Sequence, residues 1–181
     1  MKASIILSTY NRPQALLTVL EALNLQTIQD FEVCIADDGS TKDTQQIIEN
    51  FQQKSAFPIL HAWQDDRGFR AASARNNAVR MSSGDYLLFL DGDCIPRPNW
   101  IHQHLTLSEK HAFVAGNRVL LDETLSHAIE THRIPFTDLF GLNVLRHKDH
   151  INRLMPLLKI PLGSMRRLKP CLLYTSDAAD E

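Results

Sequence analysis

The chain has 181 residues, of which 44% are hydrophobic and 22% are charged, so it is neither disordered nor fibrous. Its 19 basic and 21 acidic residues leave a net charge of −2, which argues against a general nucleic-acid-binding protein. The three cysteines have no C-x-x-C spacing, which argues against a disulfide framework and a zinc knuckle. This length predicts one domain, or one domain and a fragment of another.

The hydrophobic runs are too short for a signal peptide or a membrane span. The longest of them covers residues 86–90, whereas a spanning helix needs about 20 apolar residues. We therefore expect no transmembrane segment. The cysteine usage and these short runs predict a protein of the cytoplasm or of the inner face of the cell membrane.

Strand-like and helix-like segments alternate along the first 120 residues. Nearly continuous apolar runs that end at polar turns predict strands covered on both faces. Apolar residues spaced by three or four predict helices between them, and Gly84 is predicted to cap the third helix. The predicted strands are 4–8, 31–36, 58–63 and 86–90, and the predicted helices start at Pro13, follow Ser40, and cover 71 to about 81.

This alternation predicts an α/β fold with a mostly parallel central sheet and helices on both faces. After residue 121 the pattern weakens, with one helix expected over 126–133 and a basic, poorly periodic stretch over 146–158. The sequence changes character after Lys169-Pro170, and residues 171–181 resemble a non-native tail. We expect that tail to lie outside the fold.

Acidic residues follow two of the predicted strands directly. Asp37-Asp38 comes after the second strand, and Asp91-Gly92-Asp93 follows the fourth. In parallel sheets, ligands bind at the carboxyl ends of the strands, which share one edge. Carboxylate oxygens in a tight turn suit Mg²⁺ or Mn²⁺. The alternative is that Asp91 and Asp93 form a plain solvated turn.

The Asp37-Asp38-Gly39-Ser40 segment also has two interpretations. It is either a turn that leads into a helix cap, or a site where one carboxylate accepts hydrogen bonds from the base or ribose of a nucleotide. Neither a G-x-G-x-x-G fingerprint nor a P-loop occurs elsewhere in the chain to bind a nucleotide differently.

Arginines gather at the start of the third predicted helix. Arg67, Arg70 and Arg75 can combine with backbone N–H groups into a diphosphate site. Solvated arginines on a helix face are the alternative for Arg67 and Arg70. Alanines surround Arg75 and predict close packing there.

Together these motifs resemble glycosyltransferase family 2, whose members have the nucleotide-sugar-binding GT-A fold. The resemblance rests on residues 4–12, 37–40, 68–76 and 84–93, in the order that the family has them, and covers about 3–121. Residues 116–121 are also similar to a branch of bacterial members that continue the D-x-D motif with Cys-Ile-Pro-Arg-Pro.

The resemblance implies an inverting transfer of a sugar from a nucleotide-diphosphate donor, a UDP-sugar above all, to a hydroxyl of a saccharide or cell-envelope glycan, with Mn²⁺ or Mg²⁺. It implies that Asp38 meets the uracil, that Arg75 touches the base or the diphosphate, and that Asp93 ligates the metal directly. Asp91 would face the ribose or a metal-bound water. The residues implied in nucleotide-sugar binding are Thr9, Tyr10, Arg12, Asp37, Asp38, Arg70, Arg75 and Asp91, and those implied at the metal are Asp93 and Asp91.

The resemblance also divides the chain. Residues 1–121 correspond to the nucleotide-sugar-binding core, and 122–170 to the start of an acceptor-side region. The family's general base belongs to an acidic pair on a helix well downstream of the D-x-D motif, and no segment matching that helix occurs before Lys169-Pro170. We therefore expect a donor-binding part with little or no transfer activity of its own.

Three other functions remain open at this point. A phosphoacceptor receiver domain also has acidic strand ends, but its acidic pair follows the first strand. A sugar nucleotidyltransferase shares the fold but has a glycine-rich phosphate loop where this chain has Thr9-Tyr10-Asn11-Arg12-Pro13. The third is a nucleotide-sugar-binding module without catalysis.

Overall fold

The computed structural model describes residues 1–153, so the predictions for Lys169-Pro170 and for 171–181 lie outside the described residues. Four parallel strands form one sheet in the order β3-β2-β1-β4. The predicted parallel α/β fold is thus confirmed. The strands are β1 (Ala3–Thr9), β2 (Phe31–Asp37), β3 (Ile59–Trp63) and β4 (Tyr86–Asp91), each within two residues of its predicted bounds.

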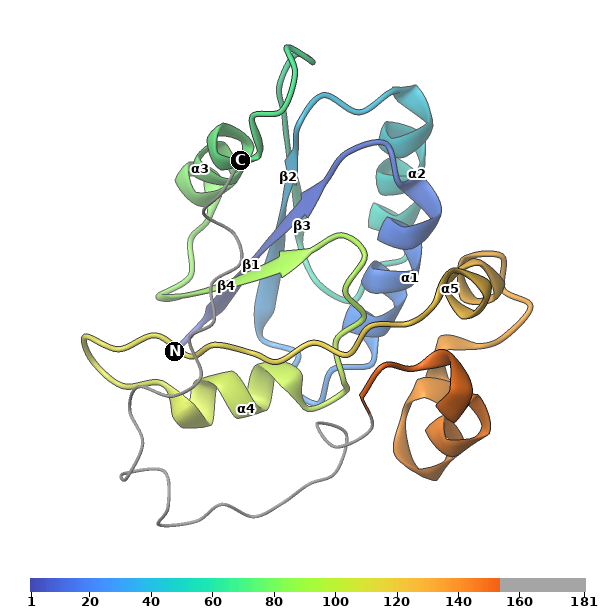
Figure 1. Cartoon of the computed structure of the whole chain (residues 1–181). Coiled ribbons are helices and arrows are strands. Elements are labelled where there is room, and N and C mark those ends of the chain that lie inside the picture. Colours follow the sequence, from blue (N-terminus) through green and yellow to red (C-terminus); the bar gives the residue numbers. More distant parts are fainter. Residues whose placement is uncertain (154–181) are drawn as a thin grey trace.

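Helices cover both faces of this sheet. Figure 1 shows α1 (Pro13–Asn24) and α2 (Lys42–Gln52) on one face and α3 (Ala71–Met81) on the other. Successive side chains of a strand point to opposite faces, so Ile5 and Leu7 pack under α1, whereas Ile6 packs with Ala74 and Ala78 of α3. The alanines let α3 approach the sheet closely, and Arg75 is thereby held near the strand ends.

The strand ends align at one edge of the sheet. Thr9 of β1 pairs with Asp37 of β2, and Ser8 pairs with Asp91 of β4. The backbone N–H of Asp38 continues the ladder by donating to the carbonyl of Thr9 at 3.2 Å. Both acidic segments therefore emerge beside the end of β1.

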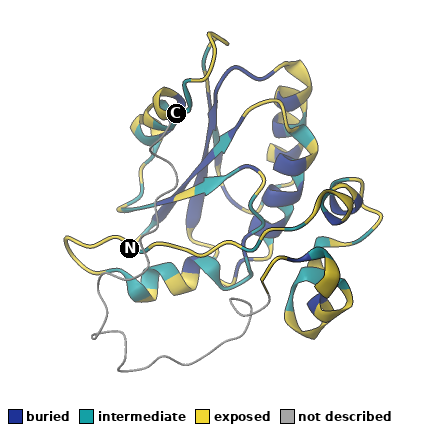
Figure 2. Cartoon of the chain, in the orientation of Figure 1, coloured by how far each residue is buried: buried dark blue, intermediate teal, exposed yellow. Residues whose placement is uncertain are grey.

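Strand β4 is less buried than its sequence suggests. It is wholly apolar from 86 to 90, yet only Leu88 is buried and Phe89 is 57% exposed. Figure 2 shows the contrast with the dark blue β1 and β2. The cause is position, because β4 is the edge strand of the sheet within residues 1–153.

The prediction for Gly84 is wrong. Helix α3 ends at Met81, and its carboxyl cap is Ser82 in an extended conformation. Gly84 instead passes close to β1, where an added Cβ would lie 2.8 Å from the backbone nitrogen of Ser4. The glycine is required by this close approach and not by helix termination.

Beyond β4 the chain adds short helices and a small core of its own. The helix expected over 126–133 is α5 (Glu123–Glu130); it begins earlier because the Asp122 side chain accepts from the Leu125 N–H at 2.8 Å. Leu125, Ile129, Val144 and Ile151 cluster together. The other elements are α4 (Trp100–Leu107) and the 3₁₀ helices at Phe136–Leu139 and Gly141–His150.

No helix among residues 1–153 is long and apolar enough to cross a membrane. The division of the chain at residue 121 stays a prediction.

Candidate functional site

A cavity of about 390 Å³ lies at the carboxyl edge of the sheet, within the range of small-molecule sites. It is lined by the ends of β1, β2 and β4 and the residues after them, by the start of α3 and the loop before it, and by one distant arginine. The lining residues are Ser8, Thr9, Tyr10, Arg12, Ala36, Asp38, Gly68, Phe69, Ala71, Arg75, Asp91, Gly92, Asp93 and Arg118. All of the predicted site residues except Asp37, Arg67 and Arg70 are therefore brought together; Arg67 instead forms an exposed ion pair with Asp65 at 3.0 Å.

Asp91 and Arg75 form an ion pair at the rim of the cavity. One Nη of Arg75 lies 2.9 Å from Asp91 Oδ1 and 3.2 Å from the Ser8 hydroxyl, which itself donates to Asp91 Oδ1 at 3.1 Å. Both charged side chains are partly exposed, at 38% and 48%, so the pair adds little to stability. Its effect is to hold the guanidinium of α3 over the end of β4.

Asp38 is nearly buried and is held by two hydrogen bonds. Its Oδ1 accepts from Gln64 Nε2 at 2.6 Å, and its Oδ2 accepts from the backbone N–H of Arg70 at 2.7 Å. An ionised carboxylate offers about four lone-pair sites, so Asp38 retains acceptor capacity toward the cavity.

Arg70 acts through its backbone. Its guanidinium donates to the carbonyl of Asp65, and its side chain does not line the cavity, although Phe69 and Ala71 on either side do. The expectation that the Arg70 side chain contributes to a diphosphate site is not met by this geometry.

Asp37, the last residue of β2, lies outside the cavity, and its side chain is directed at the turn that follows. It is 0% exposed, and its carboxylate accepts from the Ser40 N–H at 2.8 Å and lies 2.9 Å from His61 Nε2. Burial raises the pKa of Asp37, but the hydrogen bonds from His61 and Ser40 outweigh it and leave the pKa below its ordinary value. Of the two interpretations of this segment, Asp37 serves the turn and Asp38 faces the cavity.

The segment after β1 forms one wall. Asn11 has a positive φ of 49°. Its backbone N–H donates to the side-chain oxygen of residue 40, and its own side-chain oxygen accepts from the backbone N–H of residue 41. Tyr10 donates its hydroxyl to Asp66 at 2.9 Å, and that bond and the Asp66 charge raise the pKa of Tyr10. The buried Thr9 hydroxyl has no hydrogen-bond partner among residues 1–153. Arg12 reaches Glu130 of α5 at 2.6 Å.

The turn after β4 presents two carboxylates. Gly92 is buried against β1, where an added Cβ would lie 2.5 Å from the Ser8 carbonyl oxygen, while Asp93 is exposed at the cavity. Burial, together with the charges of Asp93 and Asp91, raises the pKa of Cys94 to about 11, so this thiol stays protonated.

Within residues 1–153 no three His, Cys, Asp or Glu side chains cluster into a closed metal site. Two carboxylates fit Mg²⁺ or Mn²⁺, which keep waters and share phosphate oxygens.

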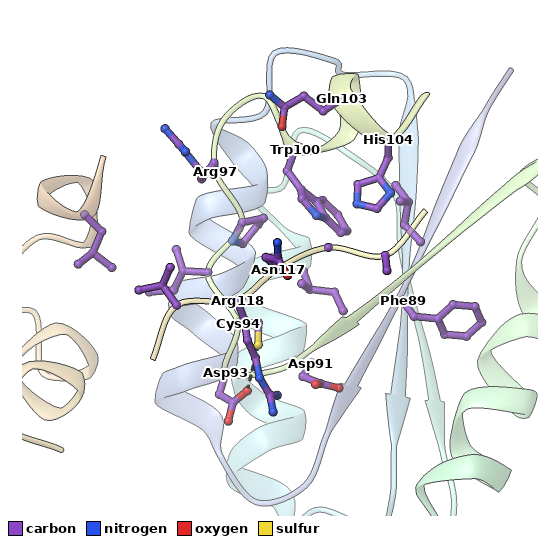
Figure 3. A pocket seen from close by; sticks show the side chains of 18 of the residues that line it. Phe89, Asp91, Asp93, Cys94, Arg97, Trp100, Gln103, His104, Asn117 and Arg118 are labelled. Carbon is purple, nitrogen blue, oxygen red and sulfur yellow. Dashed lines mark hydrogen bonds between the residues drawn. The ribbon is translucent and has the colours of Figure 1, made fainter. Parts of the chain in front are cut away.

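Arg118 is a site residue to which the sequence assigned no role. It lines the cavity from a segment without regular structure, and Figure 3 shows its side chain pointing toward the end of the cavity that carries Asp93. A second cavity of about 1200 Å³ adjoins the first and shares Arg12, Asp91, Asp93 and Arg118 with it. Residues 112–121 line the second cavity together with β4 and bring Arg118 there, and no local motif encodes their path.

The sequence model of "Glycosyl transferase family 2" matches residues 4–169. The chain belongs to this family. The match decides against the receiver and nucleotidyltransferase alternatives, because neither is a glycosyl transferase.

Individual relatives agree with this assignment. The chain is 37% identical over 122 residues to hyaluronan synthase of Pasteurella multocida, covering 66% of this chain and 12% of that protein. It is 36% identical over 120 residues to validoxylamine A glucosyltransferase of Streptomyces hygroscopicus subsp. jinggangensis, covering 65% of this chain and 27% of that protein. The chain thus spans well under two thirds of the length of these curated relatives.

A solved relative has the same fold. The crystal structure of S. aureus TarS 1-349 in complex with UDP-GlcNAc matches with a TM-score of 0.50 and 29% identity, over 59% of this chain and 30% of that one. This glycosyl transferase of family 2 therefore shares its α/β sheet with a protein that binds a UDP-sugar.

Proposed function

We propose that this chain is the donor-binding part of an inverting glycosyltransferase that transfers a sugar from a UDP-sugar to a hydroxyl of a saccharide or cell-envelope glycan. The observation that carries the proposal is the convergence of Asp38, Arg75, Asp91 and Asp93 on one cavity, in a chain of this family. The UDP-GlcNAc complex of TarS supports the choice of donor class.

The nucleotide lies across the strand ends in this proposal. Asp38 accepts the ring N–H of uracil, and the backbone of 9–12 forms the wall beside the base. Arg75 and Arg118 supply positive charge toward the diphosphate, with Arg75 already held at the cavity by its 2.9 Å contact with Asp91. Guanidinium groups suit this task because they stay charged and bind phosphate oxygens in a fork.

Asp93 and Asp91 are the residues that would hold Mn²⁺ or Mg²⁺. Such an ion supplies positive charge where the nucleoside diphosphate leaves. The larger adjoining cavity, which shares the acidic pair, is the proposed acceptor side. An acceptor there would approach the donor from the side of α4 and residues 112–121.

Calorimetric titration of the 181-residue chain with UDP, with and without Mn²⁺, tests the proposal. We expect saturable binding that needs the metal. Asp93→Asn should reduce the metal-dependent affinity at least tenfold, because one of two carboxylates is lost. Asp30→Asn, an exposed aspartate at the opposite edge of the sheet, is the matched control and should bind as the original chain does.

Two results would count against the proposal. The absence of metal-dependent heat with UDP contradicts donor binding at this cavity. Equal binding by the Asp93→Asn and Asp30→Asn variants contradicts the assignment of the metal.

Binding of UDP-sugar without sugar transfer or hydrolysis identifies the chain as a donor-binding part, which is the expected outcome.

A further inference from the structure

Gln64 joins the base end of the cavity to the helix that carries Arg75, although it lines neither cavity. It follows β3 directly and is half-buried. Its side-chain nitrogen donates to Asp38 at 2.6 Å, and its side-chain oxygen accepts from the Ser73 hydroxyl at 3.0 Å and from Asn77 Nδ2 at 3.1 Å. One amide thus connects the end of β2 with two successive turns of α3.

The chemistry of the partners fixes the orientation of this amide. An ionised Asp38 can only accept, so it must face the NH₂ group of Gln64, and the Asn77 NH₂ group must face the Gln64 oxygen. A flipped amide would set donor against donor and acceptor against acceptor. Gln64 therefore has one rotamer that satisfies all three neighbours.

Asp38 receives its hydrogen bonds from uncharged groups in this arrangement. The two donors that it receives within residues 1–153 are the Gln64 amide and the backbone N–H of Arg70, and both are uncharged. Asp91, in contrast, is paired with the Arg75 guanidinium. The carboxylate at the base end is thus oriented by neutral groups and remains a strong acceptor.

We infer that Gln64 is a positioning residue that sets nucleobase specificity, an inference that rests on the proposed function. A carboxylate held in one orientation selects bases whose ring nitrogen carries a hydrogen. Uracil offers such an N–H at N3, whereas cytosine presents a lone pair at the same atom. Gln64 discriminates between the two by holding Asp38 in place, without contact to the nucleotide.

Calorimetry with UDP and with CDP, on the 181-residue chain in Mn²⁺, tests the inference. We expect the original chain to bind UDP more tightly than CDP. Gln64→Glu keeps the acceptor toward Ser73 and Asn77 but replaces the donor toward Asp38 by a carboxylate oxygen that repels it, and Gln64→Ala loses both. Both variants should lose about tenfold in UDP affinity and less than about twofold in CDP affinity, so the UDP/CDP ratio falls. Gln45→Ala, an exposed glutamine of α2, is the matched control and should keep the ratio.

A merely structural role predicts a different result. If UDP and CDP affinities fall together, or if the ratio stays as in the original chain, the inference is overturned while the proposed function stands. If the original chain binds no UDP, the proposed function fails and the inference with it. Circular dichroism verifies the fold of each variant, and where Gln64→Ala does not fold, the ratio of the isosteric Gln64→Glu decides.

Discussion

Glu32 connects three strands at the edge of the sheet opposite the cavity. This buried carboxylate of β2 accepts from the Ser4 hydroxyl of β1 at 2.6 Å, and from the Ser83 N–H at 2.5 Å and hydroxyl at 2.9 Å in the turn that enters β4. The Lys2 ammonium adds an ion pair at 3.1 Å. We predict that Glu32→Gln destabilises the fold, because the amide replaces an acceptor oxygen by an NH₂ group that faces these donors.

The magnitude follows from the pKa of Glu32. Burial raises this pKa, but hydrogen bonds from Ser4, Ser83 and Lys2 outweigh burial and lower it from 4.5 to about 2. A shift of that size corresponds to roughly 3 kcal/mol in favour of the ionised folded state. The glutamine retains part of the network, so we expect a loss of about 2–3 kcal/mol at pH 7, or roughly 4–12 °C in Tm.

The pH dependence provides the sharper test. A carboxyl group whose pKa is lower in the folded state stabilises the fold above its unfolded pKa, and this stabilisation is lost as the pH falls. The difference between the original chain and Glu32→Gln should therefore shrink between pH 4.5 and about 2 in urea unfolding curves. Glu109→Gln, an exposed glutamate, is the control. A difference of Glu32→Gln that is below about 0.5 kcal/mol and independent of pH would refute the reasoning.

Two further substitutions probe how the site is positioned. Ala78→Leu places a larger side chain at a fully buried contact between α3 and the sheet. We expect the free energy of unfolding, measured in urea, to fall by about 1–3 kcal/mol. An unchanged stability would contradict the close packing of α3. Gly92→Ala sets a Cβ 2.5 Å from the Ser8 carbonyl oxygen, which should displace the turn of Asp91 and Asp93 and weaken UDP binding several-fold. Titration with UDP and Mn²⁺ measures this affinity. An unchanged affinity would contradict the prediction and show that the turn adapts.

The sequence predicted the sheet well because apolar runs carry most of the information on buried parallel strands. The same patterns predicted which residues meet at the carboxyl edge. The carboxyl ends of parallel strands share one edge of the sheet, so acidic residues that follow two strands and an arginine at the start of a helix are expected to lie there together. Asp38, Arg75 and Asp93 come together as expected. This success depends on β1 lying between β2 and β4, which aligns Thr9 with Asp37 and Ser8 with Asp91.

The remaining details depend on tertiary placement. Asp37 and Asp38 are chemically identical neighbours, and only the alternation of side chains at the end of β2 buries the first against Ser40 and His61 and sets the second at the cavity. Arg70 contributes a backbone N–H, which no side-chain pattern reveals. Arg118 reaches the cavity on a segment without regular structure, where no periodicity exists to predict its path.

The two acidic ends of the cavity are held in different ways, and this difference bears on how the proposed donor binds. Asp38 is oriented by uncharged donors, so its acceptor capacity is present before any ligand arrives. Asp91 is engaged with Arg75, so under the proposed function this guanidinium divides its hydrogen bonds between Asp91 and a diphosphate. A base end that is organised in advance costs little on binding, whereas the phosphate end exchanges one set of charge contacts for another. Nucleobase specificity would therefore depend on the fold around Asp38, and diphosphate affinity on the balance of charge among Arg75, Arg118, Asp91 and Asp93.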